Sequence, residues 1–201
     1  MTDLFADNAY EWDQMPVPQA ISAGVGRALH AHVPLSDALE VMDFGAGTGL
    51  VALALAPHVA RVWAVDVSAA MLATLAAKPE LQGKVQPVCQ DILAEPLGRK
   101  FDLIVSAMAM HHVRDTDALI RRFSEHLRPG GRVALADLDS EDGSFHPAGM
   151  AGVYHSGFDR EVLGALLVAD GFMDVRFRTA MEVSKEGRRY PIFLVTATLA
   201  G

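Results

Sequence analysis

A short glycine-rich run places the strongest constraint on how this chain can fold. The segment VMDFGAGTGL, residues 41–50, carries Asp43 and then glycines at positions 45, 47 and 49. Glycine adopts positive φ angles readily and lets another molecule approach the backbone closely. Three glycines so close together would weaken a helix or a strand. We therefore expect a strand that ends in a turn built to hold a ligand.

The rest of the chain alternates between β-branched apolar runs and runs rich in Ala and Leu. Strands are predicted at 39–44, 61–67, 84–89, 101–107 and 132–138. Helices are predicted at 50–56, 68–78, 116–127 and 159–171, before two final strand-like runs at 173–184 and 189–200. The alternation is typical of a parallel sheet with helices on both faces. Only the residues KEGR need separate the final runs, so these two can form an antiparallel hairpin.

Length and composition exclude several classes of protein. The chain has 201 residues and is 51% hydrophobic, which favours one well-packed domain. Its net charge is −8, and the basic pairs Arg121/Arg122 and Arg188/Arg189 are isolated, so a nucleic-acid partner is not expected. Cys89 is the only cysteine, which excludes an internal disulfide and a cysteine-based metal site.

The sequence shows no pattern typical of secretion or of a membrane span. The first residues are acidic and do not resemble a signal peptide. No apolar stretch approaches the ~20 residues needed to span a bilayer. We therefore expect a cytoplasmic protein without stable membrane insertion.

Two phosphate-binding motifs match the glycine run poorly. The dinucleotide fingerprint G-x-G-x-x-G requires glycine at position 50, where this chain has Leu50. A pyrophosphate at the start of the following helix would also face the like charge of Asp43. A P-loop requires Lys and Ser or Thr after the glycines, and these are missing. A cationic ligand group is favoured, and an NAD- or FAD-dependent oxidoreductase remains the less favoured alternative.

Acidic residues follow the next two predicted strands. Asp66 ends the second strand, where a carboxylate can accept hydrogen bonds from two ribose hydroxyls. Asp91 follows the third strand and can accept a hydrogen bond from an exocyclic amine, with the backbone N–H of Ile92 beside it. A ligand with an ammonium group, a ribose and an adenine, and without phosphate, fits all of these groups.

These motifs resemble a known family. DFGAGTG, VDVS, QDI, FDLIVSAMAMHHV and LRPGGRVALAD are similar, in order and spacing, to class I S-adenosylmethionine-dependent methyltransferases, and most of all to the small-molecule group that includes quinone-biosynthesis enzymes. The resemblance implies an α/β, Rossmann-like three-layer sandwich with a seven-stranded, mostly parallel sheet and an antiparallel last strand. It also implies S-adenosyl-L-methionine as cofactor, a small-molecule methyl acceptor, and a monomer or homodimer.

The resemblance further implies a division of one domain, residues 1–201. Residues 1–34 contain FADNAYEWDQMP, which is similar to a segment that covers the cofactor in such enzymes. Residues 35–138 form the cofactor-binding core, 139–158 a substrate loop, and 159–201 the final helix and hairpin. The residues implied to bind the cofactor are Asp43, Gly45, Ala46, Gly47, Gly49, Asp66, Val67, Met71, Asp91, Ile92, Ser106 and Tyr10.

Histidines after the fourth strand are candidates for acting on the acceptor. His111 is the predicted general base, since an unperturbed imidazole has a pKa of ~6.5. Adjacent side chains rarely point the same way, so we expect one of His111 and His112 to order the loop instead. The predicted acceptor contacts are His112, Phe145, His146, Tyr154 and His155.

Two further expectations concern a metal ion and a second possible function. Four histidines could be read as a metal cluster, but the adjacent pair lacks the spacer that two ligands usually need, so no metal is expected. A non-catalytic module that binds S-adenosylmethionine and regulates a partner remains open as a second function.

Overall fold

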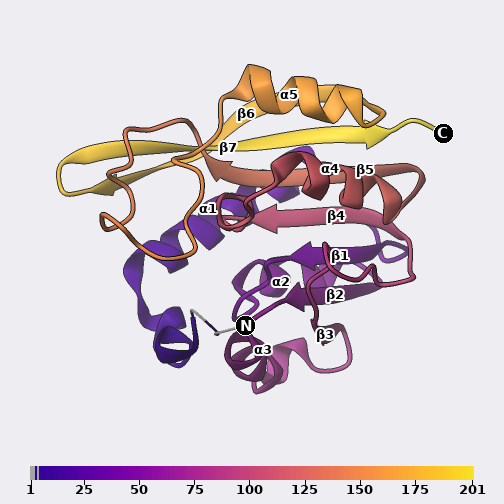
Figure 1. Cartoon of the computed structure of the whole chain (residues 1–201). Helices are drawn as coiled ribbons and strands as arrows, with labels where there is room; N and C mark the ends of the chain where they lie inside the picture. The colour runs from indigo at the N-terminus through magenta and orange to yellow at the C-terminus, as the bar shows by residue number, and fades with distance from the viewer. Residues whose placement is uncertain (1–2, 4) are drawn as a thin grey trace.

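The computed structural model describes residue 3 and residues 5–201. Its centre is one sheet with the strand order β3-β2-β1-β4-β5-β7-β6 (Figure 1). The strands are β1 (Glu40–Phe44), β2 (Arg61–Asp66), β3 (Val85–Cys89), β4 (Phe101–Ala107), β5 (Leu127–Leu138), β6 (Phe172–Lys185) and β7 (Arg188–Leu199). Strands β1 to β5 pair in parallel, and β7 runs antiparallel to both of its neighbours. The predicted fold class is confirmed.

Helices cover both faces of this sheet. They are α1 (Pro16–His32), α2 (Leu50–Leu55), α3 (Ala69–Ala76), α4 (Thr116–Glu125) and α5 (Arg160–Ala169). Buried residues of α1, α2 and α3 belong to one hydrophobic core, and those of α4 and α5 belong to the core on the opposite face. The three layers follow from this division (Figure 1). In the described part of the chain, every helix is too short or too polar to cross a membrane.

The final hairpin has the form that its sequence favours. Glu186 and Gly187 join β6 to β7 and have φ angles of 52° and 78°. Two central residues with positive φ are typical of a type I′ turn, whose twist matches that of the flanking strands. The predicted strands agree with β6 and β7 to within one residue at each end.

Helix α1 is the largest element that the sequence analysis did not assign. Its prolines, Pro16 and Pro18, lie in the first turn. Backbone N–H groups have no intrahelical acceptor there, so the N–H that proline lacks costs no hydrogen bond. Val25 and Leu29 are buried against the sheet. Packing of this apolar face, rather than helix propensity, fixes the segment as a helix.

Strand β5 begins earlier than predicted. Leu127 already pairs with Phe101 of β4, five residues before the expected start at position 132. The register between β4 and β5 then shifts between Phe101 and Leu103. Proline and glycines in LRPGG (127–131) are the residues of a bulge, which the sequence pattern did not distinguish from a loop.

Candidate active site

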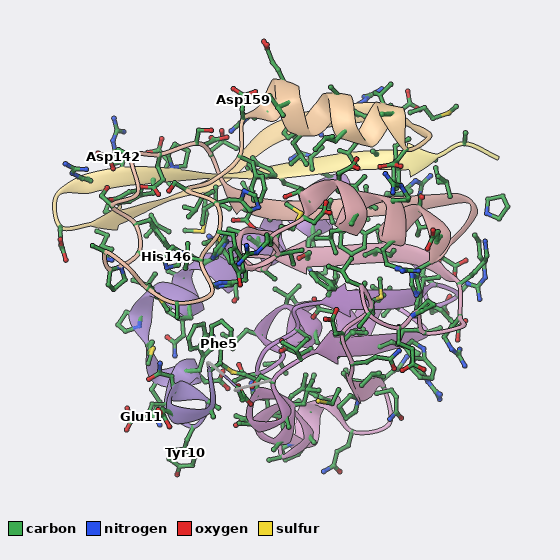
Figure 2. All side chains as sticks on the ribbon, viewed as in Figure 1. Phe5, Tyr10, Glu11, Asp142, His146 and Asp159 are labelled. Carbon is green, nitrogen blue, oxygen red and sulfur yellow. The ribbon has the colours of Figure 1, made fainter. Side chains whose placement is uncertain are left out.

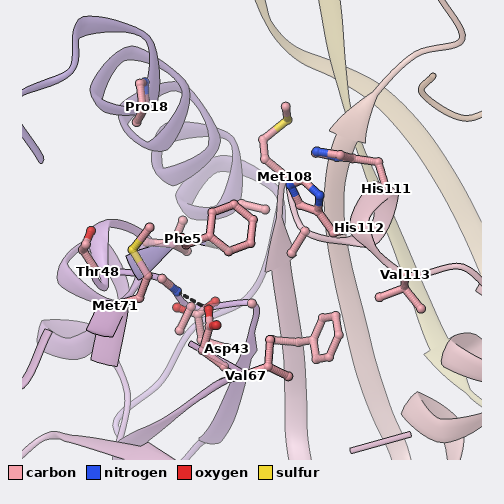
Figure 3. A pocket seen from close by; sticks show the side chains of 18 of the residues that line it. Phe5, Pro18, Asp43, Thr48, Val67, Met71, Met108, His111, His112 and Val113 are labelled. Carbon is pink, nitrogen blue, oxygen red and sulfur yellow. Dashed lines mark hydrogen bonds between the residues drawn. The ribbon is translucent and has the colours of Figure 1, made fainter. Parts of the chain in front are cut away.

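A cavity of about 470 Å³ lies at the carboxyl ends of the parallel strands. Its walls come from the loops after β1, β2, β3 and β4, from the beginning of α1, and from the loop at 139–158. Figure 3 shows His111, His112 and Val113 on one side of this cavity and Thr48 and Met71 on the other. Open α/β sheets bind ligands at this end, and the volume suits a small organic molecule.

The glycine turn forms part of the wall. Gly45, Gly47 and Gly49 all have positive φ, at 67°, 53° and 84°. Gly45, Ala46 and Gly47 line the cavity, and a Cβ on Gly47 would meet nothing within 4 Å. Gly49 faces elsewhere, because its Cβ would lie 2.8 Å from Leu75 Cδ1. Gly47 therefore opens the backbone to a ligand. Gly45 instead makes room for Ala109, whose Cβ would clash with a Cβ at position 45, and Gly49 allows α2 to pack on α3.

Asp43 presents an unsatisfied carboxyl group to the cavity. The side chain is 1% exposed, and its Oδ2 has no hydrogen-bond partner among the described residues. Burial, with a smaller contribution from the charge of Asp66, raises the pKa of Asp43 to about 8. A cationic group that entered the cavity would favour the ionised form and would give Oδ2 its partner.

This shift leads to a prediction for Asp43→Asn. Between the ordinary carboxyl pKa of 3.8 and about 8, the folded chain binds more protons than the unfolded chain at this position, so rising pH destabilises the fold. Asn stays neutral, and the variant should be more stable than the wild type at pH 8 by at least about 1 kcal/mol, with no such gain at pH 4. Denaturant unfolding at both pH values measures this difference. Equal stability at pH 8 would show that the fold does not raise the pKa of Asp43.

Asp66 and Asp91 also line the cavity. Asp66 is held by two backbone donors, since its Oδ2 lies 2.7 Å from the Gly47 N and its Oδ1 lies 2.8 Å from the Ser68 N. Burial raises the pKa of Asp66. Asp91 accepts a hydrogen bond from the Leu93 N at 2.9 Å. A carboxylate has about four acceptor sites, so both side chains retain capacity for a ligand.

The other residues expected to bind the cofactor divide into two groups. Val67 and Met71 line the cavity, Val67 being exposed and Met71 buried. Ile92 and Ser106 do not line it. Ile92 packs in the core on the α4 side of the sheet, and the Ser106 hydroxyl is buried without a partner among the described residues.

Tyr10 lies outside the cavity. Its side chain is 83% exposed and points away from the molecule (Figure 2). Phe5 and Trp12 line the cavity in its place. The two 3-10 turns around Tyr10, Ala6–Asn8 and Trp12–Gln14, have no sequence periodicity that could show which aromatic side chain faces inward.

Residues 5–14, which we call the N-terminal strap, are fastened to the rim of the cavity. Asp13 forms an ion pair with Lys78 and accepts a hydrogen bond from the Thr48 hydroxyl at 2.5 Å. The Thr74 hydroxyl donates to the Ala9 carbonyl at 3.3 Å. A small number of polar contacts therefore hold the strap against the rim of the cavity.

Three imidazoles gather on the opposite wall. The ring centroid of His111 lies 4.1 Å from that of His112 and 4.9 Å from that of His146, and all three residues line the cavity. A 3-10 turn, Met110–His112, brings both His111 and His112 to the cavity, and His112 also orders the loop at 139–158, as expected of one of the pair, since its Nδ1 lies 2.7 Å from the Gly152 carbonyl oxygen. Burial, and then the charge of His111, lower the pKa of His112 and of His146 to about 4. Both are neutral at neutral pH.

His111 has a fixed tautomer. Its Nδ1 lies 2.7 Å from Oδ1 of Asp137, which also accepts a hydrogen bond from the Leu138 N at 2.8 Å. The second carboxylate oxygen accepts from the His111 N at 3.3 Å. A carboxylate only accepts, so Nδ1 carries a hydrogen, and in the neutral imidazole Nε2 then carries the lone pair. This Nε2 is buried and has no partner among the described residues.

The loop at 139–158 contributes some of its expected side chains. Phe145, His146 and Tyr154 line the cavity. His155 does not, since its Nε2 lies 2.9 Å from the Val113 carbonyl oxygen and holds the loop to the chain after β4. Among the described residues, no group of three or more His, Cys, Asp or Glu side chains is arranged to hold a metal ion.

The fold and the cavity together define a class of protein. An antiparallel β7 inserted between β5 and β6 distinguishes this sheet from that of a dinucleotide-binding domain. A glycine turn after β1 and acidic residues after β2 and β3 complete the arrangement. The chain carries a class I S-adenosylmethionine-dependent methyltransferase domain.

Comparison with known proteins agrees with this assignment. Residues 41–131 match the model of the family described as a methyltransferase domain. An uncharacterized methyltransferase of Schizosaccharomyces pombe is 31% identical over 135 residues, which cover 59% of this chain and 48% of that protein. Ubiquinone biosynthesis O-methyltransferase of Xanthomonas axonopodis pv. citri is 32% identical over 158 residues, which cover 71% of this chain and 62% of the relative. The chain thus spans about half to three fifths of these relatives.

A solved structure supports the fold over the whole chain. The N-methyltransferase NodS of Bradyrhizobium japonicum WM9, crystallised with S-adenosyl-L-homocysteine, superposes with a TM-score of 0.73. The match covers 99% of this chain and 95% of NodS, at 18% sequence identity. At this identity, the likeness shows a shared fold.

Proposed function

We propose that this protein transfers a methyl group from S-adenosylmethionine to a hydroxyl group of a small, largely apolar molecule. One observation carries the proposal. A single cavity is lined on one side by the glycine turn and three carboxyl groups, and on the other by His111 with a free Nε2.

The first side of the cavity fits the cofactor. Asp43 would pair with the ammonium group, and the open space at Gly47 would admit the ligand against the backbone. Asp66 would accept from the ribose hydroxyls and Asp91 from the adenine amine, with Met71 against the ring. When bound, S-adenosylmethionine supplies a methyl group on a positively charged sulfur, which a nucleophile can attack in line.

The histidine side favours a hydroxyl over an ammonium group as the acceptor. The lining carboxyl groups, Asp43, Asp66 and Asp91, all lie at or just beyond the carboxyl ends of β1, β2 and β3, and none lies among the histidines. A charged amine would therefore lack a counterion there, whereas the neutral rings of His112 and His146 can hydrogen-bond to an uncharged group. The O-methyltransferase name of the Xanthomonas relative agrees with this choice.

His111 is suited to remove the hydroxyl proton. Its Nε2 lone pair would accept that proton as the oxygen becomes nucleophilic, and the nearby carboxylate of Asp137 would stabilise the resulting imidazolium. Phe5 and Trp12 of the N-terminal strap shield the same space from water. Holding acceptor and donor in line is worth up to ~7–11 kcal/mol of the barrier in well-oriented pairs.

Binding and turnover experiments test this function separately. We expect calorimetry to give micromolar-scale binding of S-adenosylmethionine and S-adenosylhomocysteine, and no measurable binding of NAD, because Leu50 stands where the dinucleotide fingerprint requires its third glycine. Methyl-labelled S-adenosylmethionine should then label an oxygen atom in a panel of hydroxylated aromatic compounds. Binding without turnover on any acceptor would favour the regulatory module. Tight NAD binding without S-adenosylmethionine binding would overturn both.

A further inference from the structure

A second cavity, of about 240 Å³, lies where the end of α1 meets strands β5, β7 and β6. It shares no lining residue with the first cavity. Three arginines line it, together with a histidine and two threonines: Arg132, Arg176, Arg178, His32, Thr196 and Thr198. Such a concentration of positive charge is unexpected on a chain whose net charge is −8.

Strand register places these side chains on one face of the sheet. Arg132 of β5 is opposite Thr198 of β7, and Arg176 of β6 is opposite Thr196. Directly paired residues share a face, as do residues two apart, so Arg178 follows Arg176 on the same side about 7 Å further along β6. From these spacings the Arg132 and Arg176 backbones are roughly 12 Å apart, which two arginine side chains can bridge through one ligand.

The position of the cavity follows from where α1 ends. Ala134 lies two residues from Arg132 on the same face and is buried in the core that contains Val25 and Leu29 of α1. The helix stops at His32, and beyond it this face of β5, β7 and β6 is no longer covered. The arginines therefore stand in a recess whose floor is sheet and whose wall is the end of a helix.

The guanidinium groups of these three arginines form no ion pair with the described residues. Among the described residues, none of them lies within 4.0 Å of a carboxylate or donates a side-chain hydrogen bond, whereas Arg128 and Arg160 each do both. Asp174 also lines the cavity without forming an ion pair with them. Each guanidinium offers five N–H donors in a planar fork that suits two oxygens of an anion.

We propose that this cavity binds the phosphate group of a small molecule. Two or more arginines would donate in pairs to the phosphate oxygens, with the Thr196 and Thr198 hydroxyls as further donors. A phosphate with a small organic group fits a space of about 240 Å³. A nucleic-acid strand instead requires an extended row of cations, and the negative charge of the chain opposes it.

Titration with three probes tests the site in the full chain. The probes are inorganic phosphate, phenyl phosphate and a short single-stranded RNA. We expect saturable binding of a phosphate probe, with shifts in the amide resonances of Thr196 and Thr198. The double variant Arg132→Gln/Arg176→Gln should weaken this binding at least tenfold. If that variant does not fold, Arg178→Gln should weaken it at least threefold.

A matched control separates a site from general charge. Arg27 and Arg61 are exposed and form no ion pair among the described residues, and neither lines the cavity. Arg27→Gln/Arg61→Gln makes the same change in net charge and should leave phosphate binding within twofold of the wild type. Equal weakening in both double variants, no saturable binding of either phosphate probe, or tighter binding of RNA than of phenyl phosphate would overturn the proposal. Stronger binding of phenyl phosphate than of inorganic phosphate would identify an organic phosphate as the ligand, and the reverse would identify the free ion.

Discussion

Gly47→Val is expected to reduce S-adenosylmethionine affinity more than a hundredfold while the chain remains folded. Gly47 has a φ of 53° and lines the cavity, and no atom lies within 4 Å of the point where a Cβ would stand. A branched side chain there would occupy the space into which the ligand must enter. The left-handed backbone conformation adds a strain of about 1–3 kcal/mol, which reduces stability but does not unfold a typical domain. Calorimetric titration with S-adenosylhomocysteine measures the loss.

Gly83→Val provides the matched control. Gly83 also has a positive φ, 79°, and also has no atom within 4 Å of a Cβ, but it does not line the cavity. Both variants therefore carry a similar backbone strain, and only one fills the cavity. We expect Gly83→Val to bind S-adenosylhomocysteine like the wild type. If the two variants lose affinity equally, strain explains the loss, and the glycine turn is not a ligand surface.

His111→Ala is expected to reduce turnover by about 10²–10⁴-fold with little change in cofactor affinity. The variant removes the only Nε2 that is both held by a buried carboxylate and free toward the cavity among the described residues. Single-turnover kinetics with labelled S-adenosylmethionine gives the rate, and calorimetry gives the affinity. His58→Ala, at an exposed position outside the cavity, should leave both unchanged. Normal turnover of His111→Ala would assign this histidine to loop structure alone.

Asp137→Asn tests whether Asp137 positions the base His111 or only packs beside it. Asn retains the size of Asp137 but loses the charge that stabilises the imidazolium of His111. The rate of methyl transfer should therefore decrease, while the affinity for S-adenosylhomocysteine and the stability of the fold stay close to those of the wild type. A lower rate with an equal loss of affinity or stability would give Asp137 a structural role only.

Most of the fold could be predicted because its signals are local. The apolar β-branched runs agree closely with β1, β2, β4 and the final hairpin, since buried parallel strands are apolar throughout and a Glu-Gly turn has few alternatives. Helix α1 was not predicted, because prolines and glycines in residues 15–34 lower helix propensity and only tertiary packing compensates. The early start of β5 was missed for a similar reason, since its bulge depends on the neighbouring strand.

The same contrast between local and nonlocal signals holds for the candidate site. Asp43, Asp66 and Asp91 could be placed from sequence because each lies at or just beyond the end of a predicted strand, and the carboxyl ends of parallel strands share one edge of the sheet. Asp137 was not predicted as a partner of His111, since this pairing joins β5 to the loop after β4 and leaves no trace in either segment. Which face of an irregular segment turns inward also depends on distant parts of the chain, so Tyr10 was predicted to line the cavity where Phe5 and Trp12 do.

The N-terminal strap connects the two sides of the cavity. It is fastened to the cofactor side through Asp13, Thr48 and Lys78, and it reaches the histidine side through an edge contact of Phe5 with His112, whose ring centroids are 5.1 Å apart. Because one segment contacts both sides, we expect its displacement to uncover both together. Ligand exchange on the two sides should then be coupled, so that a tightly held product in either half delays the release of the other.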